Sequence, residues 1–488
     1  MGGTLAGMDI SADKPFPRYE SIVDDYAAFC AALSRPLPVT LWANPERIEV
    51  EELRQQLQGA GMNPEVIPWY PGGFRLPAGE RAGKRWEFFA GLYQIQEEAA
   101  MLPVALLDPQ PGELVLDMCA APGNKTAQIA FAMDNRGTVL ANDLNRKRIP
   151  ALRQTCERLG LRNVAVINYN GSNIAGHAAR FDRILVDAPC SCEGTTRKNP
   201  NQGMQSELHF SAKQRGAQAA LLHKAAQLCK VGGRIVYSTC TYAPEENEAV
   251  VDEVLEAYGH ENLRIVECAL PPPFTAGHGL TEWEGRRFHA DLSRSIRVWP
   301  HQNDTGGFFV TVLEKTAERE SHGAQPPNDE TTTLPAEDAQ PLHEVIERYG
   351  VTERTIAGLR TIRGKGEQMF LLPEEFCMPS YFESRDIGLR TLRTDSEMPK
   401  PAHPGAMFLG QHAGKNIVQL ASDRAAAFMR RKALDLEPEE MIECDGGGFV
   451  LVKCGTACVG VGILCTADDG HKYLVSNFPR RWAARLGE

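Results

Sequence analysis

Residues 226–249, AQLCKVGGRIVYSTCTYAPEENEA, hold the feature around which the rest of the chain is organised. The pattern predicts a helix end, a turn at Gly232 and Gly233, and a buried strand that ends just before Cys240. About fifty residues upstream, FDRILVDAPCSCEG (181–194) repeats this arrangement and places Asp187 and Cys190 after a short apolar strand. Open α/β sheets bind ligands at the carboxyl ends of their strands, so we expect both cysteines to face one crevice. Either cysteine alone would as readily be a small buried hydrophobe, but the two together with Asp187 favour thiol chemistry on a substrate.

Strand and helix patterns alternate around these two motifs. Apolar runs predict strands at 114–118, 138–143, 164–170, 184–186, 234–240 and 306–315, and helical spacing predicts helices at 125–133, 146–159, 214–229 and 246–258. Such alternation is typical of βαβ units. We therefore expect an α/β domain over residues 108–315, built on a doubly wound, mostly parallel, Rossmann-like sheet.

A smaller α+β domain is predicted over residues 15–107. Helical spacing covers 19–33 and 50–57, a strand is expected at 39–44, a strand and turn at 65–74, and a helix at 91–107 that leads into the main domain. This domain is a candidate for contact with RNA. Its aromatic residues Trp42, Trp69, Tyr70 and Phe74 could stack on bases, although such residues more often belong to a core.

Two further segments follow the main domain. Residues 316–340 are rich in acidic residues, Pro and Thr, and predict a linker; residues 314–344 hold eight acidic and two basic side chains, more than half of the chain's net charge of −11. The overall acidity therefore does not exclude a nucleic-acid partner. Residues 341–488 predict a β-rich domain, with a helix at 342–349 and strand-like runs at 405–410, 415–421, 447–455 and 458–466. Three of its cysteines, Cys454, Cys458 and Cys465, lack the ligand spacing of a zinc site, so no metal is expected.

Composition indicates a globular protein of a reducing compartment. The 488 residues are 43% hydrophobic and 24% charged, and the thirteen cysteines are scattered rather than paired in a disulfide framework. We see no signal peptide and no run near the roughly 18 apolar residues of a membrane span. We therefore expect a cytoplasmic monomer without a membrane partner.

The loop DMCAAPGNKT (117–126) predicts a cofactor site. Small residues at Ala120, Ala121 and Gly123 let backbone N–H groups approach a ligand, and Lys125 opens the next helix. The loop lacks the GxGxxG pattern of dinucleotide sites. Asp143 ends the second strand, where an acidic residue binds ribose hydroxyls or caps a helix, and Asn170 could contact an adenine ring. An adenosine cofactor with an amino-acid tail, S-adenosylmethionine, fits this set.

Three long motifs, DMCAAPGNKT, DAPCSCEGTTRKNP and YSTCTYAPEENE, together resemble the nucleolar-protein/Sun family of S-adenosylmethionine-dependent RNA cytosine-5 methyltransferases. GLYQIQEEAAMLP, RVWPH and TGGFFVTVLEK look like the flanking motifs of that family, and the resemblance covers about residues 16–315. HPGAMFLG, CVGVG and LVSNFPRRW near the C-terminus look like the PUA-like RNA-binding extension of the bacterial small-subunit rRNA enzymes of this family. The resemblance thus implies methylation of RNA, with 16S rRNA or the small ribosomal subunit as partner.

The resemblance also assigns roles to residues. It implies Cys240 as the nucleophile, Cys190 as the cysteine that assists product release, and Asp187 as the carboxylate between cofactor and target base. For the cofactor site it implies the loop residues Cys119, Ala120, Ala121, Pro122, Gly123, Asn124 and Lys125, together with Asp143, Asn170 and Asp187. The sequence departs from the family at Asn124 (often Gly), Asn170 (usually Asp), Cys192 (commonly Gly) and Trp42 (an expected Arg).

Other functions remain open at this stage. A tRNA cytosine-5 methyltransferase would use the same site, and a DNA cytosine-5 methyltransferase would use the cysteine of the Pro-Cys pair, Cys190, as nucleophile. A dehydrogenase would need a glycine fingerprint that this loop lacks. A ribosome-assembly factor would bind RNA without turnover, although the two cysteines and Asp187 argue against it. Arg197 and Lys198 could hold an RNA backbone or form a solvated basic pair.

Overall fold

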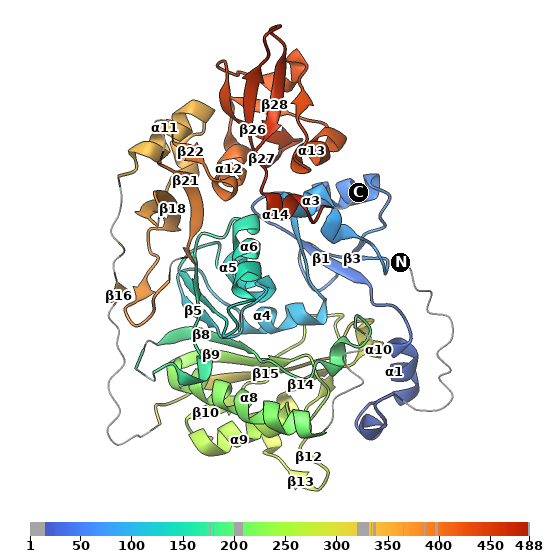
Figure 1. Cartoon of the computed structure of the whole chain (residues 1–488). Helices are drawn as coiled ribbons and strands as arrows, with labels where there is room; N and C mark the ends of the chain where they lie inside the picture. The colour runs from blue at the N-terminus through green and yellow to red at the C-terminus, as the bar shows by residue number, and fades with distance from the viewer. Residues whose placement is uncertain are drawn as a thin grey trace.

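The computed structural model describes residues 15–175, 177–178, 180–199, 208–319, 331–332, 334, 338–364, 366–384, 386–395 and 399–486. In Figure 1 the N-terminal part (blue), the central sheet (cyan to yellow) and the C-terminal part (orange to red) pack against one another. Most of the predicted acidic linker, 316–340, lies outside the described residues. No helix in the described ranges is long and apolar enough to span a membrane.

The central sheet has the strand order β11-β14-β15-β9-β8-β5-β6-β7-β20, with β10 paired to β15. Its strands are β5 (Leu114–Asp117), β6 (Thr138–Asn142), β7 (Val164–Ile167), β8 (Phe181–Asp187), β9 (Cys229–Thr239), β10 (Leu263–Ile265), β11 (Gly277–His278), β14 (Ile296–Val298), β15 (Phe308–Lys315) and β20 (Asp386–Ile387). The five strands from β9 to β7 are parallel, as predicted, and β15 and β20 pair with them antiparallel. Because β20 comes from beyond residue 315, the C-terminal part completes one edge of this sheet.

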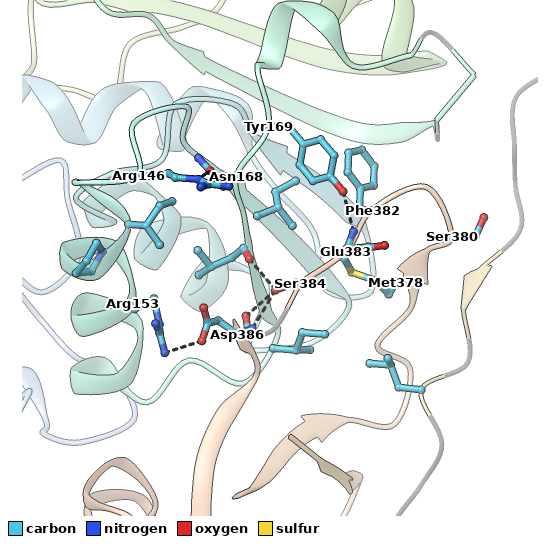
Figure 2. Close-up of a pocket in the computed structure, with 16 residues that line it drawn as sticks. Arg146, Arg153, Asn168, Tyr169, Met378, Ser380, Phe382, Glu383, Ser384 and Asp386 are labelled. Atoms are coloured by element: carbon cyan, nitrogen blue, oxygen red, sulfur yellow. Dashed lines mark hydrogen bonds and ion pairs between the residues drawn. The ribbon is translucent and has the colours of Figure 1, made fainter. Parts of the chain in front are cut away.

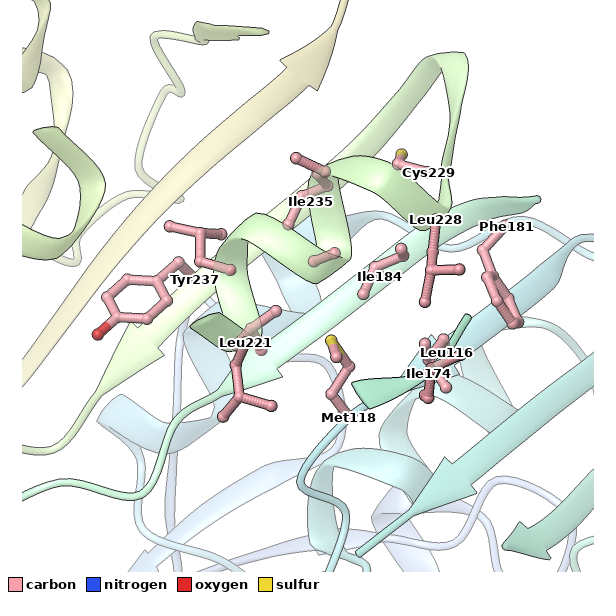
Figure 3. Packing of buried hydrophobic residues seen from close by; sticks show 14 of the residues in the cluster. Leu116, Met118, Ile174, Phe181, Ile184, Leu221, Leu228, Cys229, Ile235 and Tyr237 are labelled. Carbon is pink, nitrogen blue, oxygen red and sulfur yellow. The ribbon is translucent and has the colours of Figure 1, made fainter. Parts of the chain in front are cut away.

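Helices cover both faces of the parallel strands, and this explains their nearly continuous apolar sequences. The helices are α4 (Leu102–Leu107), α5 (Asn124–Ala132), α6 (Ile149–Leu159), α8 (Leu208–Leu228) and α9 (Glu248–Tyr258). Along β8, Ile184 and Val186 belong to the core cluster under α8 and α9, which Figure 3 shows, whereas Leu185 belongs to the cluster under α4, α5 and α6. The alternation follows from the two-residue period of a strand.

The turn predicted at Gly232 and Gly233 lies within the bounds of β9, at a point where the strand pairing is interrupted. Cys229 pairs with Phe181 of β8 and Arg234 pairs with Arg183, so the register shifts between these two pairs. Gly232 has φ 82°, and a Cβ on Gly233 would lie 2.8 Å from the Asp182 carbonyl oxygen. The four residues 230–233 therefore have no partner in β8 or β15, and the pairing of β9 resumes at Arg234.

The N-terminal part is a four-stranded sheet, in the order β2-β3-β1-β4, with short helices. Its elements are α1 (Tyr26–Leu33), β1 (Val39–Ala43), α2 (Val50–Gly59), β2 (Glu65–Val66), β3 (Gly73–Leu76), α3 (Trp86–Phe89) and β4 (Tyr93–Ile95). The single helix predicted at 91–107 is wrong in its first half. Residues 93–95 form β4, which pairs antiparallel with β1 and places Gln94 opposite Trp42.

The C-terminal part is rich in strands, as predicted. It contains a four-stranded sheet of β17 (Leu359–Arg363), β18 (Gln368–Pro373), β21 (Leu389–Arg393) and β22 (Lys400–Pro401), and a six-stranded sheet of β23 (Ile417–Gln419), β24 (Leu434–Asp435), β25 (Met441–Ile442), β26 (Gly448–Cys454), β27 (Ala457–Thr466) and β28 (Lys472–Ser476). Its helices are α11 (Gln340–Tyr349), α12 (His403–Leu409), α13 (Ser422–Met429) and α14 (Arg480–Ala483).

One predicted strand of this part, at 405–410, is wrong, because residues 405–409 belong to α12. Pro404 lies in the first turn of that helix, where its missing N–H costs nothing. The C-terminal part also shares a core cluster with the N-terminal part, to which Phe428 and Trp482 contribute from one side and Phe74 and Phe89 from the other. The sheet of the N-terminal part and the C-terminal part therefore share one core.

Candidate active site

Cys190 and Cys240 meet at the carboxyl ends of two adjacent parallel strands. Cys240 follows β9 directly, Cys190 lies three residues after β8, and their Sγ atoms are 3.4 Å apart. Cys190 is buried, whereas Cys240 is partly accessible. The structure therefore brings together two thiols that are fifty residues apart in the sequence.

Main-chain and side-chain bonds hold the two cysteine loops against each other. Gly194 N donates to the Cys240 carbonyl oxygen at 2.9 Å, and the hydroxyls of Ser191 and Thr241 are 2.7 Å apart. The buried carboxylate of Glu246 accepts from Ser191 N at 3.0 Å and from Gln218 Nε2 at 2.9 Å. These hydrogen bonds fix the positions of the two loops and therefore of their thiols, as a reactive site requires.

Asp187 ends β8 beside the thiol pair. Its Oδ2 is 2.8 Å from Lys125 Nζ, and its Oδ1 accepts from Ser238 Oγ at 2.9 Å. Since Lys125 comes from the predicted cofactor loop, this ion pair joins that loop to the cysteine side of the site. The carboxylate is 30% exposed and can therefore still meet a ligand.

The predicted cofactor loop, 119–125, connects β5 to α5 at the same edge of the sheet. Gly123 has φ 104°, and a Cβ there would lie 3.0 Å from Leu152, so glycine is required. Asn124, which stands where the family often has Gly, accepts from Gln94 Nε2 at 2.7 Å and donates to the Ile95 carbonyl oxygen at 3.2 Å. This departure therefore ties the loop to the N-terminal sheet.

A cavity of about 540 Å³ unites these groups. Its lining includes the loop residues Cys119, Ala120, Ala121, Pro122, Asn124 and Lys125, and also Asp187, Cys190, Cys192, Lys198 and Cys240. Asp117 lines it as well, and its Oδ1 is buried without a hydrogen-bond partner among the described residues. Burial raises the pKa of Asp117 to about 7, against the opposing bond from Thr126. The cavity is thus large enough for a nucleoside-sized ligand beside the thiols.

The site raises the pKa of both Cys190 and Cys240. Bonds with Cys192 and Cys240, followed by burial, raise the pKa of Cys190. For Cys240, the bond from Cys190 favours the thiolate, but Cys192 and burial outweigh it and raise the pKa above that of a free thiol. A nucleophilic role for Cys240 therefore requires its proton to leave as the substrate binds.

Asp143 follows β6, as predicted, but its carboxylate is buried. Oδ2 accepts from Ala121 N at 3.1 Å, Oδ1 accepts from Asn145 N at 2.8 Å, and Arg148 Nη1 lies 3.3 Å from Oδ2. Helix α6 begins at Ile149 with Arg148 as its N-cap, so the alternative that Asp143 caps this helix is wrong. A contact with ribose stays a prediction, and it requires the carboxylate to become accessible.

Asn170 lies apart from the cavity. It is exposed, and its Oδ1 accepts from the main-chain N and the hydroxyl of Ser172. Its contact with adenine stays a prediction. Leu144, which follows Asp143, is 65% exposed although it is apolar.

Comparison with known proteins places the chain in a family. The family model described as 16S rRNA methyltransferase RsmB/F matches residues 104–314, and that for the N-terminal domain of 16S rRNA methyltransferase RsmF matches residues 17–98. A ribosomal RNA small subunit methyltransferase F of Vibrio cholerae is 32% identical over 477 residues, which cover 93% of this chain and 95% of the relative. This chain belongs to the RsmB/F methyltransferase family. It is accordingly an RNA cytosine-5 methyltransferase, as the motifs predicted.

Other relatives of this RsmB/F protein share less of the chain. The tRNA (cytosine(49)-C(5))-methyltransferase of Pyrococcus abyssi is 35% identical over 62% of this chain and 96% of its own length. The human 28S rRNA (cytosine(4447)-C(5))-methyltransferase is 34% identical over 64% of this chain and 38% of its own. A solved methyltransferase homologue from Pyrococcus horikoshii, 31% identical, covers 60% of this chain and 91% of that one with a TM-score of 0.53. These likenesses confirm the Rossmann-like methyltransferase fold.

The RsmB/F structure corrects the interpretation of Arg197 and decides between the two alternatives for the aromatic residues. Arg197 is neither a solvated basic residue nor placed to bind phosphate: its side chain is 1% exposed and donates to the Thr305 carbonyl oxygen at 2.8 Å and to Asp304 at 2.7 Å. Lys198, by contrast, is exposed and lines the cavity. Trp42 and Trp69 are buried and donate to Gln96 and Glu98, so these aromatics belong to the core instead of stacking on bases.

A second, larger cavity of about 1010 Å³ lies between the RsmB/F sheet and the C-terminal part (Figure 2). Arg153 pairs with Asp386 across it at 2.6 Å, and Tyr169 OH accepts from Glu383 N at 2.9 Å. None of Cys190, Cys192 and Cys240 and no residue of the loop 119–125 is among its described lining residues. The larger of the two cavities is therefore not the one that contains the thiol pair.

Proposed function

We propose that this enzyme methylates C5 of a cytosine in 16S rRNA, with S-adenosylmethionine as methyl donor and Cys240 as a covalent nucleophile at C6 of the base. The observation that carries the proposal is the thiol pair Cys190–Cys240 beside Asp187, in the cavity that also contains the loop 119–125. Methyl transfer to a ring carbon needs an activated base and a methyl donor in one enclosed space, and this cavity provides for both.

The residues around the loop fit the cofactor. The unpartnered Oδ1 of Asp117 can accept from the amino group of an amino-acid tail, and the ring of Phe308 and the small residues Ala120 and Ala121 line the same cavity. The positive φ of Gly123 turns the chain into α5 and directs the N-terminal amides of that helix toward the site. When bound there, S-adenosylmethionine supplies an electrophilic methyl group.

The protein's own residues activate the base. C5 of cytosine is a weak nucleophile, and addition of the Cys240 thiolate at C6 converts the ring to an enamine with a nucleophilic C5. Asp187 is suited to hold the polar edge of the base, at N3 and the exocyclic amine, while Lys125 and Ser238 fix its carboxylate. The accessible Cys240 suits attack, and the buried Cys190, 3.4 Å away, suits assistance when the C5 proton leaves and the C6–S bond breaks. The target base must first leave its stack.

The extent of similarity favours 16S rRNA over tRNA as substrate. A match over 93% of the chain, as with the Vibrio cholerae enzyme, has to include most of the C-terminal part, whereas the archaeal tRNA enzyme matches 62% of the chain. We infer that residues 341–488 form a PUA-like RNA-binding domain beside an N-terminal RNA-contacting domain at 15–107, the methyltransferase domain at 108–315 and the linker at 316–340. We further infer that the enzyme acts as a cytoplasmic monomer.

A denaturing gel with labelled RNA and cofactor tests the roles of the cysteines. Cys240→Ala should abolish both methylation and any covalent protein–RNA band, because no C6 adduct forms. Cys190→Ala should attack, transfer methyl and then stall, which leaves a slow-migrating band; the Cys190→Ala, Cys192→Ala double variant removes the neighbouring thiol as a substitute. A band that is lost with Cys190→Ala and kept with Cys240→Ala would reverse the two roles, as in a DNA-type enzyme.

Bisulfite sequencing of total RNA tests the substrate. In cells that lack this gene, one cytosine of 16S rRNA should become unmethylated, and the wild-type gene should restore it. Loss of methylation at a tRNA cytosine instead would identify tRNA as the substrate. Binding to the small subunit without any change in methylation would favour an assembly factor.

A further inference from the structure

A third thiol lies against the catalytic pair. The sulfur atoms of Cys190, Cys192 and Cys240 all lie within 4.8 Å of one another, and no other group of three His, Cys, Asp or Glu side chains in the described part of the chain is arranged to hold a metal ion. Cys192 Sγ also lies 3.4 Å from the Cys190 carbonyl oxygen, to which it donates. Methyl transfer as proposed above gives no role to Cys192.

The backbone at Cys192 explains how this thiol reaches the cluster. Its φ is 61°, in the left-handed region. Glycine adopts this conformation without steric strain, whereas a residue with a side chain loses about 1 kcal/mol of stability there. The loop is held in this conformation by the bond from Thr195 N to the Cys192 carbonyl oxygen, at 3.0 Å, and by that from Gly194 N to the Cys240 carbonyl oxygen. The thiol is therefore positioned by the same loop that positions the catalytic pair.

We propose that Cys190, Cys192 and Cys240 form a three-thiolate site for a soft metal ion such as Zn²⁺, and that an occupied site withholds Cys240 from RNA. Metal–sulfur bonds of about 2.3 Å place three coordinating sulfurs roughly 3.8–4.0 Å apart. The separations here, 3.4 Å for Cys190–Cys240 and at most 4.8 Å for the others, require only small side-chain rotations. Thiolates are the ligands that select zinc and similar soft ions over Mg²⁺ or Ca²⁺.

The surroundings suit such a complex. All three cysteines line the cavity, so a fourth position is open to water. Each thiol releases one proton on binding, and no electrons are transferred: three Cys–SH and one M²⁺ give a tris-thiolate complex of charge −1 and three H⁺. Lys125, Arg148 and Lys198 line the same cavity and offset that charge. The metal site stands on geometry alone, whereas its inhibitory effect rests on the proposed role of Cys240.

Titration of the reduced, metal-free full-length protein with Cd²⁺ tests the site without measuring activity. The ultraviolet thiolate-to-cadmium band should saturate with one tight equivalent in competition with a chelator. Cys192→Gly, which relaxes the backbone, should weaken this tight binding at least tenfold, the scale seen when even outer-shell support of a metal is lost. Cys268→Ser, which changes a half-buried thiol elsewhere in the central domain, should bind like the wild type. Equal binding by Cys192→Gly and wild type would overturn the proposal.

A methylation assay with Zn²⁺ tests the consequence. Zn²⁺ should inhibit the wild type, a chelator should restore it, and Cys192→Gly should stay active at Zn²⁺ concentrations at least tenfold higher, matching its loss of affinity. Inhibition relieved by a phosphine reductant and not by a chelator would instead indicate a disulfide and overturn the metal site. Tight Cd²⁺ binding in a protein that methylates no RNA would leave the metal site standing and refute the proposed function.

Discussion

Replacement of Arg297 by Met should destabilise the central domain and disturb the Cys240 loop. Arg297 lies in β14, within the motif RVWPH, and is 2% exposed. Its Nε donates to Glu248 Oε1 at 2.7 Å, and its Nη1 donates to the Tyr242 carbonyl oxygen at 2.9 Å. Glu248 begins α9 and is fully buried, so Arg297→Met leaves a carboxylate without its counter-charge and a loop without its anchor.

The expected loss of stability is about 3–5 kcal/mol, the usual cost of breaking a buried ion pair from one side. For a domain of the size matched by the family, residues 104–314, each kcal/mol lowers the unfolding midpoint by about 2–4 °C, which gives a fall of roughly 6–20 °C. Differential scanning calorimetry measures this shift. Because the Tyr242 carbonyl belongs to the loop that follows Cys240, methylation below the midpoint should also fall.

Two further variants make this test specific. Arg287→Met removes an 89% exposed arginine that lies 3.7 Å from Glu282, and such a surface pair contributes at most about 1 kcal/mol. The double variant Arg297→Met, Glu248→Met removes both buried charges and should recover most of the lost stability. A fall below about 3 °C in Arg297→Met, or no recovery in the double variant, would refute the buried-charge argument.

Three more outcomes are expected. Asp143→Ala should weaken S-adenosylmethionine binding by about 1–3 kcal/mol in calorimetry, because the ribose would lose a charged acceptor; an unchanged Kd would restrict Asp143 to its present role of bonding Ala121 N and Asn145 N. Arg480→Ala, Arg481→Ala, at two exposed positions of α14, should lower the salt slope of RNA affinity by about 1.4–1.8, and an unchanged slope would place the RNA elsewhere. Burial raises the pKa of Asp117 to about 7, above about 3.9 in the unfolded chain, so the folded carboxyl keeps its proton where the unfolded one loses it. Stability of the cofactor-free protein should therefore fall as pH rises from about 4 to about 7, and identical pH profiles for wild type and Asp117→Asn would contradict this.

The central domain could be predicted from the sequence because its signals are local. The parallel strands from β5 to β9 are short apolar runs between helical patterns, and burial on both faces leaves little freedom in how they pack. The motifs also placed Asp187, Cys190 and Cys240 at strand ends, and the topology of such sheets brings those ends to one edge. Long periodic segments therefore determined both the fold class and the location of the site.

Only the tertiary structure decided the short elements and the side-chain partners. Residues 93–95 are a strand because β1 offers them an edge, and residues 405–409 belong to a helix that packs on β27, although both runs are ambiguous as local patterns. Arg197 became a buried structural residue because four acceptors surround it, which no sequence spacing reveals. The convergence of Cys192 with Cys190 and Cys240 likewise depends on a left-handed backbone and on contacts across fifty residues. Such features arise from pairing between distant segments, whereas the patterns that can be recognised in a single sequence are mainly the periodicities within each segment.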